Sequence, residues 1–423
     1  MDNRNTRLMT ALQDIYGDAP SELDRQKARY GRLIDPFGAA FGWEPEMAFS
    51  TPGRTEISGN HTDHNHGRVL AASVNLDSIA VAAPVADATV TLYSEGYPEP
   101  FVVALADLSP REDEKETTHA LIRGIAARLD ALGHRIGGFA ACMSSEVFPG
   151  SGLSSSASVE VLIGSIFNAL YNRAAIPVET LAAIGQFAEN RYFGKACGLM
   201  DQLACAVGGI IGIDFGIPGE PRIEPVEVDF ARYGFRALIV NTGGSHADLS
   251  DNYSAVPAEM MAVARELGKT VCREITPKEL MANISRLRGR VGDRAILRAH
   301  HFLGEDQRVA DQIAALQNDD FDRFLALVRA SGDSSFKWLQ NIYPDQHAGE
   351  QGVALGLALS EDAIAAAGAG ACRIHGGGFA GTIQVLLPEE AVADYVPRME
   401  AVFGEGCVLE LSVRHTGAVH FAI

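Results

Sequence analysis

A run of glycines and serines occupies the chain as Gly150, Ser151, Gly152, Leu153, Ser154, Ser155 and Ser156. The apolar-periodic segment Val159 to Leu170 follows it, so the run leads into a predicted helix. Free N–H groups and the dipole at a helix N-terminus favour an anion. Serine hydroxyls offer donors to phosphate oxygens and an oxygen ligand to Mg²⁺. The pattern predicts a phosphate-binding loop, while a flexible linker or an ordinary N-cap stays open on these residues alone.

Asp201 is a carboxylate between apolar residues, after Cys197-Gly-Leu-Met and before Leu203. A lone Asp commonly caps a helix, and a short helix is predicted from Gln202. Burying a carboxylate without a partner would cost free energy, so a general base or a metal ligand is the competing interpretation. Glu189, on a predicted helix from Glu179 to Tyr192, has the features of an ordinary solvent-facing glutamate when taken by itself.

The polar cluster His61-Thr-Asp-His-Asn-His66 follows Pro52-Gly-Arg54, which we interpret as a rigid turn that presents an arginine. Its carboxylate and amide groups could bind a polyhydroxylated ligand. The histidines also raise the question of a metal site, but adjacent ligands in an extended loop splay apart, and no distant Cys/His pair has recognisable ligand spacing. Polar loop residues are therefore favoured over a metal site.

The segment Gly376-Gly-Gly-Phe-Ala-Gly381 matches a dinucleotide-binding fingerprint, but a strand rather than a helix is predicted after it. The dinucleotide interpretation therefore fails. Two interpretations remain equal at this point. One is a tight turn that needs glycine at positive φ, and the other is a loop that brings backbone close to a ligand.

The composition, with 423 residues of which 47% are hydrophobic and 21% charged, is typical of a globular protein long enough for two domains. The formal net charge of −19 argues against nucleic-acid and anionic-membrane partners, which need a basic face. Six scattered cysteines form no Cys-x-x-Cys pair, which suits reduced thiols. The first residues are charged, and no stretch supplies the ~20 apolar residues of a membrane span. We therefore expect a cytoplasmic protein.

The strand and helix patterns change near residue 225. Before it, one α/β unit is predicted, with helices at 8–16, 23–41 (broken near Pro36) and 118–132 and strands at 69–82, 88–93 and 138–143. After it, a strand at 235–241 precedes helices at 251–267, 277–287, 293–303, 307–316 and 320–330. The chain closes with strands at 382–387, 408–413 and 418–423 and a helix at 389–403. This ending predicts an α+β sheet domain that shares a cleft with the first unit.

Three blocks occur in order: Pro52-Gly-Arg-Thr-Glu-Ile-Ser-Gly-Asn-His-Thr-Asp63, Gly150-Ser-Gly-Leu-Ser-Ser-Ser-Ala157 and His375-Gly-Gly-Gly-Phe-Ala-Gly381. Together they resemble the GHMP small-molecule kinases. The first block and Cys197-Gly-Leu-Met-Asp-Gln202 are similar to the galactokinases. The resemblance runs from about residue 50 to the C-terminus. It implies an N-terminal ribosomal-S5-like α/β domain at 1–225 and a C-terminal ferredoxin-like α+β domain at 226–423.

The resemblance also implies roles for the candidate residues. Asp201 matches the catalytic aspartate that accepts the proton of the sugar's anomeric hydroxyl, and Arg54 matches the arginine beside it. A neighbouring Arg⁺ keeps an Asp ionised by lowering its pKa by roughly 1–3 units. Residues 150–156 match the ATP phosphate loop, in which Ser155 contacts phosphate and Ser156 binds Mg²⁺ together with Glu189. The sugar-contacting positions are Asn60, His61, Asp63, Gly198 and Tyr253, and the loop with Gly376, Gly377, Gly378 and Gly381 covers the site.

These matches imply an ATP- and Mg²⁺-dependent sugar 1-kinase that makes galactose 1-phosphate from α-D-galactose and acts as a monomer. Two alternatives are kept. One is a kinase of the same fold for another hexose or an N-acetylhexosamine. The other is a non-catalytic sugar sensor, against which the intact serine run and Asp201 count, because a sensor needs neither a base nor metal ligands.

The chain departs from the galactokinase pattern in the first block, where Glu56, Ser58, Asn60 and His64 stand in place of Asn, Ile, Glu and Tyr. Asn60 offers an amide where a sugar-binding carboxylate is expected. We hypothesise that Glu56 and Asn60 have exchanged places across one hydrogen bond and keep their pairing. Pro149 lies one residue nearer the Gly-Leu-Ser core than usual, Ala380 replaces a glycine, and an arginine pair after Tyr253 is absent. These are features of a divergent branch.

Overall fold

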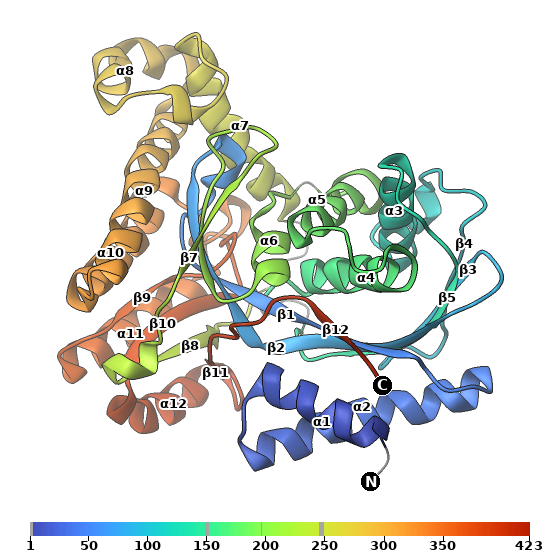
Figure 1. Cartoon of the computed structure of the whole chain (residues 1–423). Coiled ribbons are helices and arrows are strands. Elements are labelled where there is room, and N and C mark those ends of the chain that lie inside the picture. Colours follow the sequence, from blue (N-terminus) through green and yellow to red (C-terminus); the bar gives the residue numbers. More distant parts are fainter. Residues whose placement is uncertain (1–2, 149–151, 196, 245–248) are drawn as a thin grey trace.

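The computed structural model describes residues 3–148, 152–195, 197–244 and 249–423 (Figure 1). Pro149, Gly150 and Ser151, which include the start of the predicted phosphate loop, lie outside the described residues. The strands are β1 (Met47–Ser58), β2 (Arg68–Pro84), β3 (Thr89–Ser94), β4 (Phe101–Ala104), β5 (Phe139–Ser145), β6 (Ile210–Asp214), β7 (Arg222–Val226), β8 (Phe235–Asn241), β9 (Ala371–Ile374), β10 (Thr382–Pro388), β11 (Val408–Leu411) and β12 (Val419–Ala422).

The α-helices are α1 (Asn3–Tyr16), α2 (Pro20–Phe41), α3 (Thr118–Ala131), α4 (Ser155–Asn172), α5 (Val178–Ala188), α6 (Met200–Val207), α7 (Ser250–Glu266), α8 (Pro277–Val291), α9 (Asp293–Gln317), α10 (Phe321–Ser334), α11 (Gly352–Ala367) and α12 (Glu389–Phe403). The strands form an eight-stranded sheet in the order β12-β1-β2-β5-β3-β4, with β6 paired to β2 and β7 to β6, and a four-stranded sheet in the order β11-β8-β10-β9. The mixed α/β class is confirmed.

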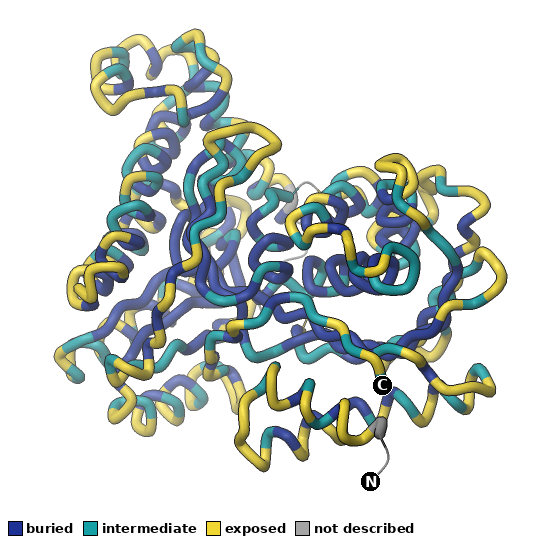
Figure 2. The backbone as a smooth tube through the Cα atoms, viewed as in Figure 1, coloured by how far each residue is buried: buried dark blue, intermediate teal, exposed yellow. Residues whose placement is uncertain are grey.

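The central strands β1, β2 and β5 of the larger sheet are buried on both faces because helices cover each side of them (Figures 1 and 2), whereas β3, β4 and β7 are partly exposed. Successive side chains of a strand point to opposite faces. In β2, Ala80 and Ala82 pack with α3, α4 and α5, whereas Ile79 and Val81 pack with α1 and α2. The N-terminal helices therefore cover an apolar face that would otherwise be exposed to water.

Two helix predictions were wrong. Pro36 does not break α2, because Leu33 and Phe37 on either side of it are buried against the sheet. Their packing outweighs the ~3 kcal/mol that proline costs inside a helix. The segments predicted as separate helices at 293–303 and 307–316 form the single helix α9. Glu305, in the predicted break, is fully buried and paired with Arg308 at 2.8 Å one turn later.

The predicted turn at Pro52-Gly-Arg54 is also wrong, since these residues lie inside β1. The register between β1 and β2 shifts between Pro52 and Arg54, where proline has no N–H to give to the ladder. Gly53 is required there because a Cβ would lie 2.9 Å from the carbonyl oxygen of Leu153. The irregularity in β1 thus brings the Arg54 backbone against the predicted phosphate loop.

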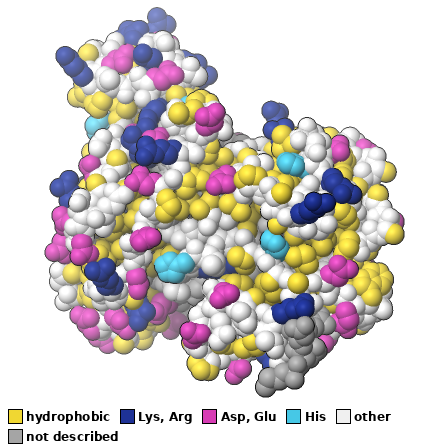
Figure 3. All heavy atoms as spheres, viewed as in Figure 1, with side chains coloured by type: hydrophobic (Ala, Val, Ile, Leu, Met, Phe, Trp, Pro, Cys, Tyr) yellow, Lys and Arg dark blue, Asp and Glu magenta, His cyan; other side chains and the backbone are white. Residues whose placement is uncertain are grey.

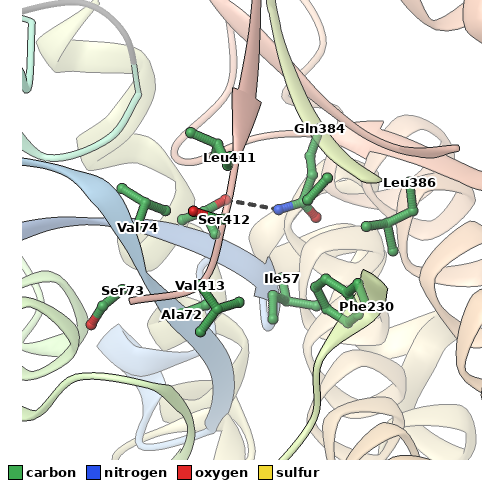
Figure 4. Close-up of a pocket in the computed structure, with 12 residues that line it drawn as sticks. Ile57, Ala72, Ser73, Val74, Phe230, Gln384, Leu386, Leu411, Ser412 and Val413 are labelled. Carbon is green, nitrogen blue, oxygen red and sulfur yellow. Dashed lines mark hydrogen bonds between the residues drawn. The ribbon is translucent and has the colours of Figure 1, made fainter. Parts of the chain in front are cut away.

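The smaller sheet packs α11 and α12 against one face. It meets the larger sheet near an isolated bridge between Val74 and Val413. Figure 4 shows a cavity at this junction, lined by Ile57, Phe230 and Leu386 among others, whose volume of about 10 Å³ has room for about one water. Gln384 of β10 donates from Nε2 to Thr55 Oγ1 of β1 at 2.8 Å, which joins the two sheets beside it.

The last strand differs from its prediction. β12 does not join the four-stranded sheet of the C-terminal half. It belongs to the larger sheet, where it pairs with β1 in register from Met47↔Ala422 to Ser50↔Val419. Arg414, just before it, donates to the buried Asp77 carboxylate at 2.9 Å. The boundary near residue 225 stays a prediction.

On the face in Figure 3, acidic side chains are prominent at the lower left, and basic side chains gather at the end of the arm that α8 forms. Among the described residues, no helix has the length and apolarity to cross a bilayer. The six cysteines, which all lie in the described ranges, are free thiols.

Candidate active site

The described part of the serine run, Gly152 to Ser156, leads into α4 as predicted. Ser154 takes a left-handed conformation (φ 59°) just before the helix begins at Ser155. At Gly152 (φ +74°) a Cβ would lie 2.5 Å from Thr382 Oγ1 and 2.7 Å from His375 Nδ1, so only glycine fits. The run therefore lies against the smaller sheet at the start of β10.

Arg54 and Asp201 form a two-point ion pair although they are 147 residues apart. Nε donates to Oδ1 at 2.8 Å and Nη2 to Oδ2 at 2.7 Å. Arg54 also holds the serine run, because Nη1 donates to the Gly152 carbonyl at 2.5 Å and the backbone N–H donates to that of Leu153 at 3.0 Å. Ser154 Oγ donates to Asp201 Oδ2. The convergence of these three segments is confirmed.

Asp201 is held in its ionised form. Burial opposes ionisation, but the charge and hydrogen bonds of Arg54 and the hydrogen bond from Ser154 outweigh it and lower the pKa of Asp201. Asp201 lies in the first turn of α6, where the helix dipole favours a negative charge. The alternative of a helix cap is wrong, because Leu199 is the N-cap residue.

Ser156 and Glu189 form a pair of oxygen donors beside this cluster. Ser156 Oγ donates to Glu189 Oε1 at 3.0 Å, and Lys195 Nζ lies 3.4 Å from the same oxygen. Glu189 is 2% exposed, so its description as an ordinary solvent-facing glutamate was wrong. A hydroxyl and a carboxylate are ligands that Mg²⁺ accepts, and the residues present therefore fit this ion.

Asp63 and Gly198 lie in direct contact. A Cβ at Gly198 would lie 1.7 Å from Asp63 Oδ2, so glycine is required for the carboxylate to approach. The Asp63 side chain is 11% exposed and lies in a 3₁₀ turn, Asp63–Asn65, just after β1. Gly198 precedes Asp201 by only three residues. A carboxylate with acceptor capacity for hydroxyl groups therefore lies near the Arg54–Asp201 pair.

The carbonyl groups of the C-terminal glycine loop accept hydrogen bonds from the predicted sugar-contacting residues. Gly376 O accepts from Asn60 Nδ2 at 2.5 Å, Gly377 O from His61 Nε2 at 2.8 Å, and Gly378 O from Tyr253 Oη at 3.0 Å. Burial lowers the pKa of His61 to about 3, so the ring is neutral and Nε2 carries the proton that the carbonyl needs. The loop thus lies directly on these three side chains.

Asn60 is fully buried, and its side-chain amide is hydrogen-bonded to other groups of the protein. Nδ2 donates to Glu56 Oε1 at 3.0 Å as well as to the loop, and Oδ1 accepts from Asn341 Nδ2 at 2.6 Å. The expected pairing of Glu56 with Asn60 is confirmed. Glu56 also pairs with the buried Arg373 at 3.0 Å. A sugar hydroxyl could reach the Asn60 amide only by displacing one of these partners.

Sequence reasoning missed Asn341. Besides its bond to Asn60, it donates to Gly377 O at 3.2 Å and accepts from the Phe379 N–H at 2.5 Å. It lies in an irregular stretch between α10 and α11, with no motif around it that could have pointed to this role. Tertiary contact alone makes Asn341 a support of the glycine loop.

Comparison with known proteins adds independent findings. The galactokinase galactose-binding signature matches residues 35–84, and the GHMP kinase N-terminal domain matches residues 120–209. The chain is 30% identical over 377 residues to galactokinase from Streptomyces coelicolor, covering 88% of this chain and 92% of the relative. The chain belongs to the galactokinase family. Bovine galactokinase is 32% identical over 391 residues, covering 90% and 94% of the two chains.

Solved structures agree with the family. The galactokinase of Lactococcus lactis, in complex with galactose, superposes with a TM-score of 0.78 at 26% identity and covers 91% of this chain and 98% of that one. Mevalonate kinase from Methanococcus jannaschii has a TM-score of 0.58 at 16% identity over 87% and 98% of the two chains, which shows the fold alone. As a galactokinase-family chain, the protein is a sugar kinase with the two-domain GHMP architecture.

Proposed function

We propose that this chain transfers the γ-phosphoryl group of ATP to the anomeric hydroxyl of α-D-galactose. The Arg54–Asp201 pair carries the proposal, because it joins a base to the loop that would bind the phosphates. Arg54 donates to Asp201 and to the Gly152 carbonyl at the same time. The names of its relatives and the galactose bound in the Lactococcus lactis structure support the choice of sugar.

Asp201 accepts the proton of the sugar hydroxyl in this proposal. Its pKa is lowered, so it is ionised at neutral pH but is a weak base. Proton transfer is then favourable once the hydroxyl oxygen begins to bond to phosphorus and becomes acidic. Arg54 stabilises both the carboxylate and the charge that develops on the phosphoryl oxygens.

Residues 150–156 would bind the ATP phosphates, and Ser156 and Glu189 would hold Mg²⁺. The chemistry that a bound Mg²⁺ supplies there is neutralisation of charge on the phosphate oxygens. His61, Asp63, Gly198 and Tyr253 would surround the sugar, and the loop from Gly376 to Gly381 would exclude water from it. We also propose that the protein acts as a cytoplasmic monomer, for which its acidic charge and free thiols are suited.

Coupled release of ADP with galactose, glucose, N-acetylgalactosamine and no sugar tests the class and the substrate together. We expect saturable turnover with galactose. A preference for another sugar would favour the alternative of a kinase for a different hexose or N-acetylhexosamine, to which the occupied amide of Asn60 gives a physical basis. Galactose binding without ADP release from any sugar would favour a sensor.

A further inference from the structure

A buried polar cluster lies behind the Ser156–Glu189 pair, and none of the roles above uses it. Glu160 on α4 and Gln202 on α6 are both fully buried. Gln202 Nε2 donates to Glu160 Oε2 at 2.9 Å and to Glu189 Oε2 at 3.0 Å. One amide group therefore bridges two carboxyl groups.

This bridge fixes the orientation of the Glu189 carboxyl group in the site. Gln202 engages Oε2, while Oε1 accepts from Ser156 Oγ at 3.0 Å. Because a carboxyl group is planar, tying one oxygen inward presents the other beside the serine hydroxyl. A ligand that is already oriented loses less conformational entropy when a cation binds.

We propose that Gln202 is a positioning residue for the Glu189 carboxylate and that Glu160 holds Gln202 in place. The inference rests on the proposed function, because it takes Ser156 and Glu189 as the cation ligands. Gln202 Nε2 has two N–H donors, and Glu160 and Glu189 each accept a hydrogen bond from it.

Two unpartnered oxygens show what Glu160 contributes. Glu160 Oε1 and Gln202 Oε1 are buried and have no hydrogen-bond partner among the described residues. Both of these oxygens are acceptors when Glu160 is ionised, and an uncharged Glu160 adds an O–H donor beside the N–H donors of Gln202. Burial, and then the charge of Glu189, raise the pKa of Glu160 well above its usual range, which agrees with this form. Gly185 of α5 leaves the space, because a Cβ there would lie 3.2 Å from Glu160 Oε2.

Gln202 also joins the cation ligands to the proposed base. It follows Asp201 on α6, and successive helical residues are about 100° apart around the axis. Asp201 therefore faces Arg54 while Gln202 faces Glu189. Any shift of α6 moves both groups together.

Mn²⁺ binding tests the inference without turnover. The enzyme is mixed with a non-hydrolysable ATP analogue and Mn²⁺, and electron paramagnetic resonance measures the Mn²⁺ that stays free. We expect Gln202→Met, which has similar size and no N–H donor, to weaken Mn²⁺ binding by about 10–100-fold. Glu160→Leu should act in the same direction. Glu160→Gln should bind nearly as the wild type does, because its amide keeps an acceptor for Gln202 Nε2 and adds an N–H donor in place of the O–H. Wild-type affinity in Gln202→Met and Glu160→Leu would overturn the inference.

Two further variants separate the causes. Asn168→Ala removes two hydrogen bonds between α4 and Ile176, at 3.0 and 3.1 Å, and should leave Mn²⁺ affinity unchanged as a control for general destabilisation. Glu189→Gln tests the ligand assignment itself. If Glu189→Gln weakens Mn²⁺ binding and neither Gln202→Met nor Glu160→Leu does, only this inference fails. If Glu189→Gln binds Mn²⁺ as tightly as the wild type does, both this inference and the proposed cation site fail.

Discussion

Replacement of Asp201 by asparagine perturbs the proposed base without changing its size. The amide keeps one acceptor but places an NH₂ group at the other position. That position, Oδ2, accepts from Arg54 Nη2 at 2.7 Å and from Ser154 Oγ. In the variant the NH₂ group would face the N–H donor of Arg54 and could not accept a hydrogen bond from it. Arg54, which is 5% exposed, would also lose its counter-charge.

We expect kcat to fall by about 10²–10⁴-fold, the range of a positioned general base, which corresponds to roughly 2.7–5.4 kcal/mol of barrier. The free energy of unfolding should fall by roughly 1–3 kcal/mol. This is less than the ~3–5 kcal/mol for breaking a fully buried pair, because the Asp201 side chain is 30% exposed. Galactose binding should largely survive.

Coupled ADP release measures kcat, and calorimetry with galactose measures binding. Asp214→Asn is a matched control, because Asp214 is paired with Arg68 and Arg273 at 2.9 Å, its side chain is 29% exposed, and it lies outside the candidate site. The control should keep its kcat. A folded Asp201→Asn variant with near-normal kcat would refute the proton-accepting role.

Exchanging Glu56 and Asn60 together should retain activity better than either exchange alone, because a 3.0 Å hydrogen bond joins them; strictly additive losses in activity assays would remove this idea. Gly198→Ala should raise the KM for sugar, since its Cβ would lie 1.7 Å from Asp63 Oδ2 and displace that carboxylate. An unchanged KM in steady-state assays would contradict the proposal that Asp63 contacts the sugar. Burial opposes ionisation of Glu305, but nearby positive charges such as Arg308 and the hydrogen bond from Ser331 lower its pKa from 4.5 to about 2. The ionised carboxylate therefore stabilises the fold fully above pH 4.5, and this stabilisation is lost as the pH falls towards 2. Melting curves of Glu305→Gln from pH 7 to 2 should show a smaller acid-induced loss than wild type, and parallel losses would contradict this.

Glu56 and Asn60, two of the positions at which this chain departs from the usual galactokinase pattern, contact the C-terminal segment that carries the glycine loop. Glu56 pairs with Arg373, and Asn60 donates to the Gly376 carbonyl. The Asn60 contact joins the first motif block to the glycine loop, and the Glu56 contact joins that block to β9, which ends just before the loop. We therefore expect substitutions at residues 56 and 60 to change the position of the loop over the site as well as the contacts of the sugar.

The sequence by itself determined the serine run, the helix that follows it, and the importance of Arg54 and Asp201. An anion site at a helix N-terminus needs its glycines, hydroxyls and helix to be contiguous in the chain, so a local pattern can predict it. The order of the motif blocks then added the pairing between Arg54 and Asp201. Patterns within a few residues were sufficient for the serine run and its helix, whereas the pairing of Arg54 with Asp201, 147 residues apart, followed from the resemblance to the galactokinases.

Only the tertiary structure decided the surroundings of Glu189 and Asn60. Glu189 is an ordinary glutamate in its local sequence, but α4 and α6 bury it against Ser156 and Gln202. Asn60 meets Asn341 and Gly376, each more than 270 residues away. Whether a polar side chain faces solvent, a ligand or a buried partner depends on segments that folding brings together, and local periodicity carries no record of them.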